Sequence, residues 1–300
     1  MIPVRIAYLD CFSGISGDMT LAALVDAGAS GDKIENELRK LPLSSFHLEW
    51  RQVMKKGVRA LKMEVIEDAL SSSPAFPAIK ELKVLNTVHG HAHDHGQDHH
   101  HDHRHHHGHD HHCHEHDHTH SHDHDHHHHH EHRRYKEIVH MIEEADFHPR
   151  VAARALTIFA KIGEAEAKIH NIPVESVHFH EVGALDSIVD IIGISLALEE
   201  LAIDQLYCGP VPTGNGYVRC DHGLYPVPAP ATMEMLKGIP LRSTNIPKEL
   251  TTPTGAGLVS ALVKQFGPVP SMTVEAIGYG AGTRDLPDQP NVLRVLIGHG

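Results

Sequence analysis

The sequence predicts an α/β fold in which helices pack on a mixed sheet, interrupted by a disordered histidine-rich insertion. Short apolar runs typical of strands alternate along the chain with longer segments whose apolar residues recur at helical spacing. Loops rich in Gly, Pro and Thr separate these segments. One tract, residues 89–132, has almost no apolar side chains to bury and cannot form a core.

The chain begins with an apolar run over residues 4–10, which predicts a strand. Helical spacing resumes near Asp18, after a loop that contains two glycines and two serines. A second helix is predicted over residues 32–40. Two alternating runs within residues 46–66, broken at residues 55–57, predict a hairpin.

Three parts follow from this pattern. Residues 1–69 form the N-terminal strand, loop, helix and hairpin. Serines and prolines from Ser71 onward mark the start of an insertion over residues 70–133. Residues 134–300 complete the same domain with helices and mixed α/β structure.

The elements after the insertion alternate in type. Helices are predicted over residues 135–145, 149–170, 187–201, 228–236 and 255–266. Strands are predicted over residues 176–180, 206–208, 216–220, 272–279 and 292–297. Pro149 suits the first position of its helix, where its missing N–H has no partner to lose.

Composition excludes several classes of protein. The tract at residues 89–132 carries −8 of the formal net charge of −13, so the rest of the chain is only mildly acidic. Nucleic acid and anionic membrane are therefore not expected partners. No apolar run is long enough to span a bilayer. Four dispersed cysteines without a C-x-x-C pair favour a reducing cytoplasm. Whether the protein forms a homo-oligomer stays open.

The histidine tract predicts binding of divalent transition metals. It contains 26 of the 34 histidines, interleaved with Asp and Glu. Neutral imidazole is a good ligand for nickel, zinc and copper, and the acids lower the cost of gathering cations. We expect several weakly held, exchangeable ions, which indicates storage or delivery rather than catalysis. A solvated linker that binds metal adventitiously is the alternative.

The first glycine loop is a candidate anion site. Four of its residues offer backbone N–H groups in front of a helix: Ser13, Gly14, Ser16 and Gly17. Phosphate or a thiocarboxylate would fit there. Asp10 and Asp18 flank the loop and could hold a magnesium or manganese ion that bridges a phosphate. A purely structural turn, with Asp18 as a helix cap, stays open.

A second cluster supplies metal ligands and acid–base groups. Five candidates lie close together in sequence: His178, His180, Glu181, Asp186 and Asp190. On a strand the two histidines share a face and Phe179 turns into the core, while Asp186 and Asp190 share a helix face. The candidates for acid–base catalysis are His178, His180, Glu181 and Asp186. The candidates for holding a metal ion are His178, His180, Glu181 and Asp190. A hydrogen-bonded core histidine is the alternative.

Two loops in the C-terminal half add further candidates. Cys220 and His222 follow a short strand and could form a soft metal pair, or a reduced core cysteine beside a turn histidine. Thr252, Thr254 and Gly255 enter a helix and could bind an anion, although N-capping also explains them.

Four of these segments together resemble the nickel-insertion proteins of the nickel-pincer nucleotide cofactor (the LarC family). They are YLDCFSGISGDMTLAALVDAGA, VHFHEVGALDSIVDIIG, GPVPTGNGYVRCDHGLYPVPAPAT and ELTTPTGAGL, in this order, with the histidine-rich insertion between the first two. The resemblance spans nearly the whole chain outside the insertion.

The resemblance implies a CTP-dependent cyclometallase, a nickel chelatase of the lyase class. Such an enzyme inserts Ni²⁺ into pyridinium-3,5-bisthiocarboxylic acid mononucleotide with Mg²⁺ or Mn²⁺, forming the cofactor of lactate racemase. Apo lactate racemase or a similar nickel-pincer enzyme is the implied recipient. Family members usually carry a further C-terminal domain associated with CTP, and this chain resembles their N-terminal portion, so whether it uses CTP and turns over alone stays open.

Two other functions remain open. The chain could be a nickel storage or delivery protein without catalysis, in which case it would take up metal and form no product. It could instead be a metal-dependent phosphohydrolase built on Asp10, Asp18 and the first glycine loop.

Overall fold

The computed structural model describes residues 4–68, 133–179, 182–220 and 223–300. The chain divides into two units, and the first comprises Met1–Ser73 and His129–Gly300. All described residues belong to this first unit. The predicted insertion over residues 70–133 lies outside the described residues, except for Arg133.

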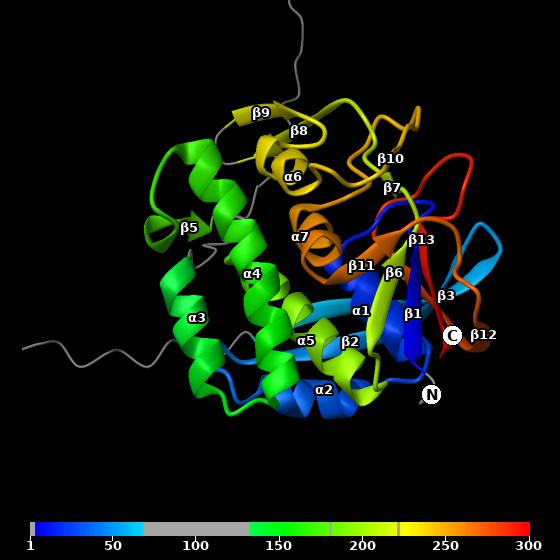
Figure 1. Ribbon diagram of the computed structural model, residues 1–300, viewed down its shortest axis with the longest axis horizontal. Coiled ribbons are helices and arrows are strands. Elements are labelled where there is room, and N and C mark those ends of the chain that lie inside the picture. Colours follow the sequence, from blue (N-terminus) through cyan, green and yellow to red (C-terminus); the bar gives the residue numbers. More distant parts are fainter. Residues whose placement is uncertain (1–3, 69–132, 180–181, 221–222) are drawn as a thin grey trace, which may run out of the picture. The chain divides into compact units, whose positions relative to one another are not determined.

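Seven strands form one mixed sheet. They are β1 (Arg5–Asp10), β2 (Phe46–Lys55), β3 (Val58–Glu67), β6 (Gln205–Cys208), β11 (Val263–Phe266), β12 (Thr273–Ala281) and β13 (Val292–His299). Their order in the sheet is β11-β6-β1-β13-β12-β3-β2 (Figure 1). The strand β1 runs parallel to β6 and antiparallel to β13. The sequence-based prediction of a mixed sheet is confirmed.

The helices lie on this sheet in successive layers. They are α1 (Gly17–Asp26), α2 (Gly31–Leu38), α3 (Tyr135–Glu144), α4 (Pro149–His170), α5 (Leu185–Glu200), α6 (Pro230–Met235) and α7 (Pro253–Leu262). The helix α1 packs against β3, β12 and β13, while α5 packs on α1, and α4 packs on α5 and α7 (Figure 1). Leu21, Leu24 and Ile192 are fully buried between these layers. The predicted α/β class with helices on the sheet is confirmed.

Short two-stranded pairs complete the described part. The strand β4 (Arg133–Arg134) pairs with β5 (His178–Phe179), β7 (Val211–Pro212) pairs with β10 (Leu241–Arg242), and β8 (Tyr217–Cys220) pairs with β9 (Gly223–Pro226). None of the helices in the described segments is long and apolar enough to cross a membrane.

Two elements differ most clearly from their predicted extent, while several others differ by one or two residues at their ends. The strand expected over residues 176–180 begins only at His178, because residues Val174–Ser176 form a 3-10 turn in which Ser176 N–H donates to Pro173 O at 2.9 Å. The helix expected over residues 255–266 ends at Leu262. Residues Val263–Phe266 form β11 instead, since pairing with β6 at the sheet edge outweighs the local helical spacing.

Candidate functional site

Three helices begin at one cleft with a volume of about 520 Å³. The starts of α1, α5 and α7 contribute Ser16, Gly17, Asp18, Asp186, Ser187, Asp190, Thr252, Pro253 and Thr254. Residues 62–66 of β3, with Val182, Glu249 and Thr283, complete the lining. This volume is in the range of pockets that bind small molecules and cofactors.

Backbone hydrogen bonds hold the starts of α1 and α7 beside each other. Ile15 N–H donates to Leu250 O at 2.9 Å, and Thr252 N–H donates to Ile15 O at 3.1 Å. A Cβ at Gly14, whose φ is +114°, would lie 2.0 Å from Leu250 O, and one at Gly255 would lie 2.3 Å from Ile15 O. Both glycines therefore permit the close approach of the two loops, and neither lines the cleft.

The helix starts present their positive ends to the cleft. Ser16 precedes α1 and Ala184 precedes α5, and neither caps its helix through a side-chain hydrogen bond. Thr252 does cap α7, because its Oγ1 accepts from Gly255 N–H at 3.2 Å. Backbone N–H groups at such starts, with the helix dipole behind them, stabilise bound anions.

Lys62 is a functional candidate that the sequence analysis did not identify. It is 7% exposed, and its Nζ donates to Asp18 Oδ2 and to Thr283 Oγ1, both at 2.8 Å. It is the only lysine or arginine among the described residues that line the cleft. Its signal in the sequence is a charged residue between Leu61 and Met63, within a strand that is otherwise apolar at this point.

Asp190 lies at the buried side of the cleft. It is 8% exposed, and a Cβ at Gly17 would lie 2.3 Å from its Oδ2, so the carboxylate lies against the start of α1. Burial raises the pKa of Asp190 well above 3.8, and the charges of Asp18 and Asp186 raise it further. Lys62 and the backbone N–H of Asp18 oppose this shift. Its Oδ1 has no hydrogen-bond partner among the described residues.

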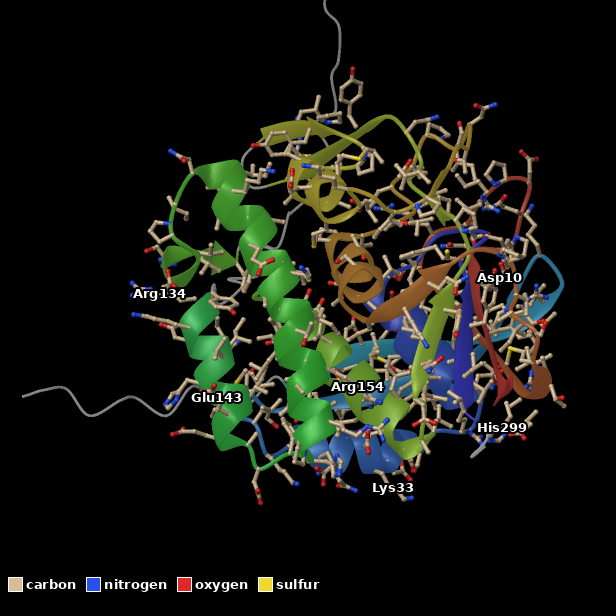
Figure 2. All side chains as sticks on the ribbon, viewed as in Figure 1. Asp10, Lys33, Arg134, Glu143, Arg154 and His299 are labelled. Carbon is tan, nitrogen blue, oxygen red and sulfur yellow. The ribbon has the colours of Figure 1, made fainter. Side chains whose placement is uncertain are left out.

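Asp10 and Asp18, the pair predicted to hold a metal ion, have different partners in the structure. Asp10, labelled in Figure 2, ends β1, and its Oδ2 accepts from Arg294 Nε at 3.0 Å. Asp18 instead contacts Ser16 and Lys62 in the cleft. In the segments that the structure describes, no three His, Cys, Asp or Glu side chains converge closely enough to hold a metal ion.

Ser13 has a supporting position rather than a place in the cleft. It is 1% exposed, and its Oγ donates to Pro290 O at 2.6 Å and accepts from Gln289 Nε2 at 2.8 Å. The hydroxyl therefore fixes the first glycine loop to the segment that precedes β13.

His178 lies on the surface, outside the cleft lining. As the pattern predicts, Phe179 is buried, and its ring contacts the rings of Tyr135 and Phe159 at centroid distances of 6.2 and 6.3 Å. His178 is exposed and stands opposite Arg134 in the β4–β5 pair. Figure 2 shows Arg134 and Asp10 on opposite sides of the molecule.

Four predicted ligands cannot be placed. His180, Glu181 and His222 lie outside the described residues, and so does the side chain of Cys220. The structure thus unites part of the second cluster, Asp186 and Asp190, with parts of both predicted anion loops. Ser16, Gly17, Asp18, Thr252 and Thr254 are the members of those loops that line the cleft.

Comparison with known proteins identifies a family. The family model described as "Nickel insertion protein" matches residues 7–300. Two relatives carry the name "Pyridinium-3,5-bisthiocarboxylic acid mononucleotide nickel insertion protein". The relative from Geobacillus kaustophilus is 49% identical over 98% of this chain and 60% of its own length. The relative from Staphylococcus epidermidis is 43% identical over 96% of this chain and 58% of its own length.

The chain thus spans about 60% of the length of the curated relatives that it matches. No solved structure matches it. The matched residues include every helix start that forms the cleft, together with Lys62. The chain therefore belongs to the nickel insertion protein family.

Proposed function

We propose that this chain inserts nickel into pyridinium-3,5-bisthiocarboxylic acid mononucleotide, the compound in the names of its relatives. Nickel is a substrate in this reaction. One observation supports the proposal best: three helix starts and Lys62 converge on one cleft. The cleft also contains the buried carboxylate of Asp190 and the partly buried carboxylate of Asp18. Such a cleft offers separate sites for a phosphate and for a reacting ring.

The phosphate is proposed to bind at the starts of α1 and α7. Backbone N–H groups and helix dipoles stabilise a phosphate at these positions. Thr254 and Lys62 line the same cleft. Lys62 is already held by Asp18 and Thr283, so its charge is fixed in place before the ligand arrives.

The reacting ring is proposed to bind near the start of α5. Formation of a nickel–carbon bond replaces a ring C–H bond, so one proton must leave the ring as the two thiocarboxylates bond to nickel. Asp186 is exposed and lines the cleft, and we propose that its carboxylate accepts this proton. The segment from His178 to Glu181 leads directly to Val182 in the cleft, and we propose its His178, His180 and Glu181 as ligands for incoming nickel.

CTP with Mg²⁺ or Mn²⁺ is proposed as the second nucleotide of the whole protein. A nucleotide-bound Mg²⁺ keeps several waters and takes only one or two protein carboxylates, so it does not require a cluster of three. Asp18 fits this role, because its carboxylate lies beside Lys62 at the start of α1. We propose lactate racemase or a similar nickel-pincer enzyme as the recipient, and the cytoplasm as the location.

The experiment supplies the protein with nickel, CTP, magnesium and the bisthiocarboxylate nucleotide, and follows the absorbance of the metallated product. It is run with the chain alone and with the full-length protein. We expect Lys62→Met to lower product formation at least about tenfold, since a fixed charge at the phosphate is lost. Lys33→Met, at a side chain that is 75% exposed, is the matched control and should leave the rate unchanged. Equal rates for the two variants would refute the assignment of the cleft.

A storage or delivery role is supported by a different observation, the 26 histidines between residues 89 and 132. Deleting this tract should lower the number of nickel ions bound per chain and spare product formation in excess nickel. Loss of all product under those conditions would show that the tract takes part in catalysis. Metal uptake without product in the intact full-length protein would favour storage as the only role.

A further inference from the structure

The cleft contains more carboxylates than ammonium groups. Lys62 and the positive ends of α1 and α7 line it together with three acids, Asp18, Glu64 and Glu249. The first turns of α5 add Asp186 and Asp190, four residues apart on one face, and we call this face the α5 wall. A ligand that reaches the α5 wall therefore meets two further carboxylates.

One carboxylate oxygen of the α5 wall is unpaired among the described residues, although the other oxygen of the same carboxylate lies against the positive end of α1. Lys62 is engaged by Asp18 and Thr283, each at 2.8 Å, so its hydrogen bonds go to groups other than Asp190. Asp190 Oδ1 has no hydrogen-bond partner among the described residues, although the residue is only 8% exposed. A buried carboxylate in this situation favours a positive group that arrives with a ligand.

The lining of the cleft favours a diffuse cation over a bare metal ion. In the part of the chain that the structure describes, no three acidic, histidine or cysteine side chains converge to ligate a metal. Apolar side chains of Met63, Val65 and Val182 line the same cleft. A flat aromatic ring with a delocalised positive charge needs no ligand shell and gains from apolar contact at its faces.

We propose that Asp190 is the specificity-determining residue for a ligand whose aromatic ring carries a positive charge. Its carboxylate acts on the ring from the buried side, while Lys62 and the starts of α1 and α7 hold the phosphate. The proposal rests on the proposed function only in placing a pyridinium nucleotide in this cleft.

Two nucleotides that differ in the charge of the ring serve as probes. Nicotinamide mononucleotide has a positive pyridinium ring, and its reduced form has a neutral dihydropyridine ring. Calorimetry at pH 8 gives the dissociation constant of each for the wild type and for Asp190→Asn. Asp32→Asn, an exposed position in the first turn of α2, is the matched control for loss of one carboxylate.

We expect the wild type and Asp32→Asn to bind the positive ring about tenfold more tightly than the neutral one, and Asp190→Asn to bind both within about threefold. Asp190→Ser, which is smaller and also uncharged, should give the same result and serves if the asparagine variant does not fold. Equal binding of the two probes by the wild type would overturn the proposal, and so would a preference that survives in Asp190→Asn.

These outcomes are independent of nickel insertion. If the protein shows the ring preference and makes no metallated product, the role of Asp190 is supported and the proposed function is refuted. If the protein makes product and binds both rings equally, the proposed function is supported and the role of Asp190 is refuted.

Discussion

Lys62 Nζ lies 2.8 Å from Asp18 Oδ2 and joins the middle of β3 to the first turn of α1. The side chains are 9% and 27% exposed, so water screens this ion pair only partly. Ser16 and Thr283 complete the hydrogen bonds of the two charged groups. The pair therefore fixes the sheet to a helix at the point where the cleft is formed, and its loss should alter stability and binding together.

We expect Lys62→Met and Asp18→Asn each to lower the free energy of unfolding by about 1–3 kcal/mol, because each leaves its partner charge poorly compensated. The double variant should lose less than the sum of the two, by about 1 kcal/mol, since the partners are then both neutral. Urea unfolding of the four proteins measures this coupling. Lys33→Met, in an exposed pair with Glu200, should cost less than about 0.5 kcal/mol. Strict additivity would show that the two groups act independently.

Asp190 should make stability depend on pH in an unusual direction. Its folded pKa lies well above the ordinary 3.8, because of burial first and then Asp18 and Asp186, with Lys62 opposing. Between these two pKa values the folded state binds a proton that the unfolded state has released, so stability falls as pH rises through this window. Asp190→Asn removes the effect. The melting temperature of this variant should exceed that of the wild type, and the excess should grow as pH rises above the ordinary pKa until the folded wild type releases the proton, by on the order of 1 kcal/mol per pH unit at most.

Should the wild type and Asp190→Asn show parallel stability from pH 5 to pH 8, Asp190 would be ionised in the folded protein throughout. That result would require a cation or hydrogen-bond donor at its Oδ1 in the free protein.

The buried thiols of Cys11 and Cys208 should resist alkylation. Their sulfur atoms lie 3.6 Å apart, and both residues are at most 2% exposed. The hydrogen bond between the Cys208 and Cys11 thiols, together with burial, raises the pKa of Cys208, which keeps it from forming the reactive thiolate. Iodoacetamide at pH 8 should leave both unmodified in the folded protein and modify both in urea, as peptide mass spectrometry would show. Equal labelling in the two states would place one of the thiols in contact with solvent.

The elements with strong periodicity were predictable from the sequence. The helix over residues 149–170 was expected with the bounds that α4 has, since Pro149 marks its start and its apolar positions recur at helical spacing. The hairpin turn at Lys55, Lys56 and Gly57 was also expected, and Lys56 and Gly57 both have positive φ. Local signals of this kind need no knowledge of distant contacts.

The arrangement of the site was predictable only in part. The loops before α1 and α7 were expected to bind anions separately, and only the Ile15–Leu250 and Thr252–Ile15 hydrogen bonds bring them to one cleft. Lys62 was missed because a lysine on a strand is ordinarily solvated, and its burial depends on Asp18, which is 44 residues away in sequence. The contact of Asp10 with Arg294 of β13 was not predicted for the same reason. Long-range pairing of charges leaves no periodic signal.

Thr252 and Ser30 provide a test that separates capping from ligand binding. Both precede helices, and both accept a backbone hydrogen bond through the hydroxyl, from Gly255 at 3.2 Å and from Lys33 at 3.4 Å. Thr252→Ala and Ser30→Ala should each cost about 1 kcal/mol of stability, the usual value of an N-cap.

Only Thr252 lines the cleft, so only Thr252→Ala should also weaken binding of nicotinamide mononucleotide. The expected loss is about threefold to tenfold, because the start of α7 is then less rigidly held at the proposed phosphate site. Chemical denaturation and calorimetry on both variants measure the two effects. If both variants bind the nucleotide as tightly as the wild type at equal stability loss, then Thr252 is a cap alone, and the phosphate binds at Lys62 and α1 without help from α7.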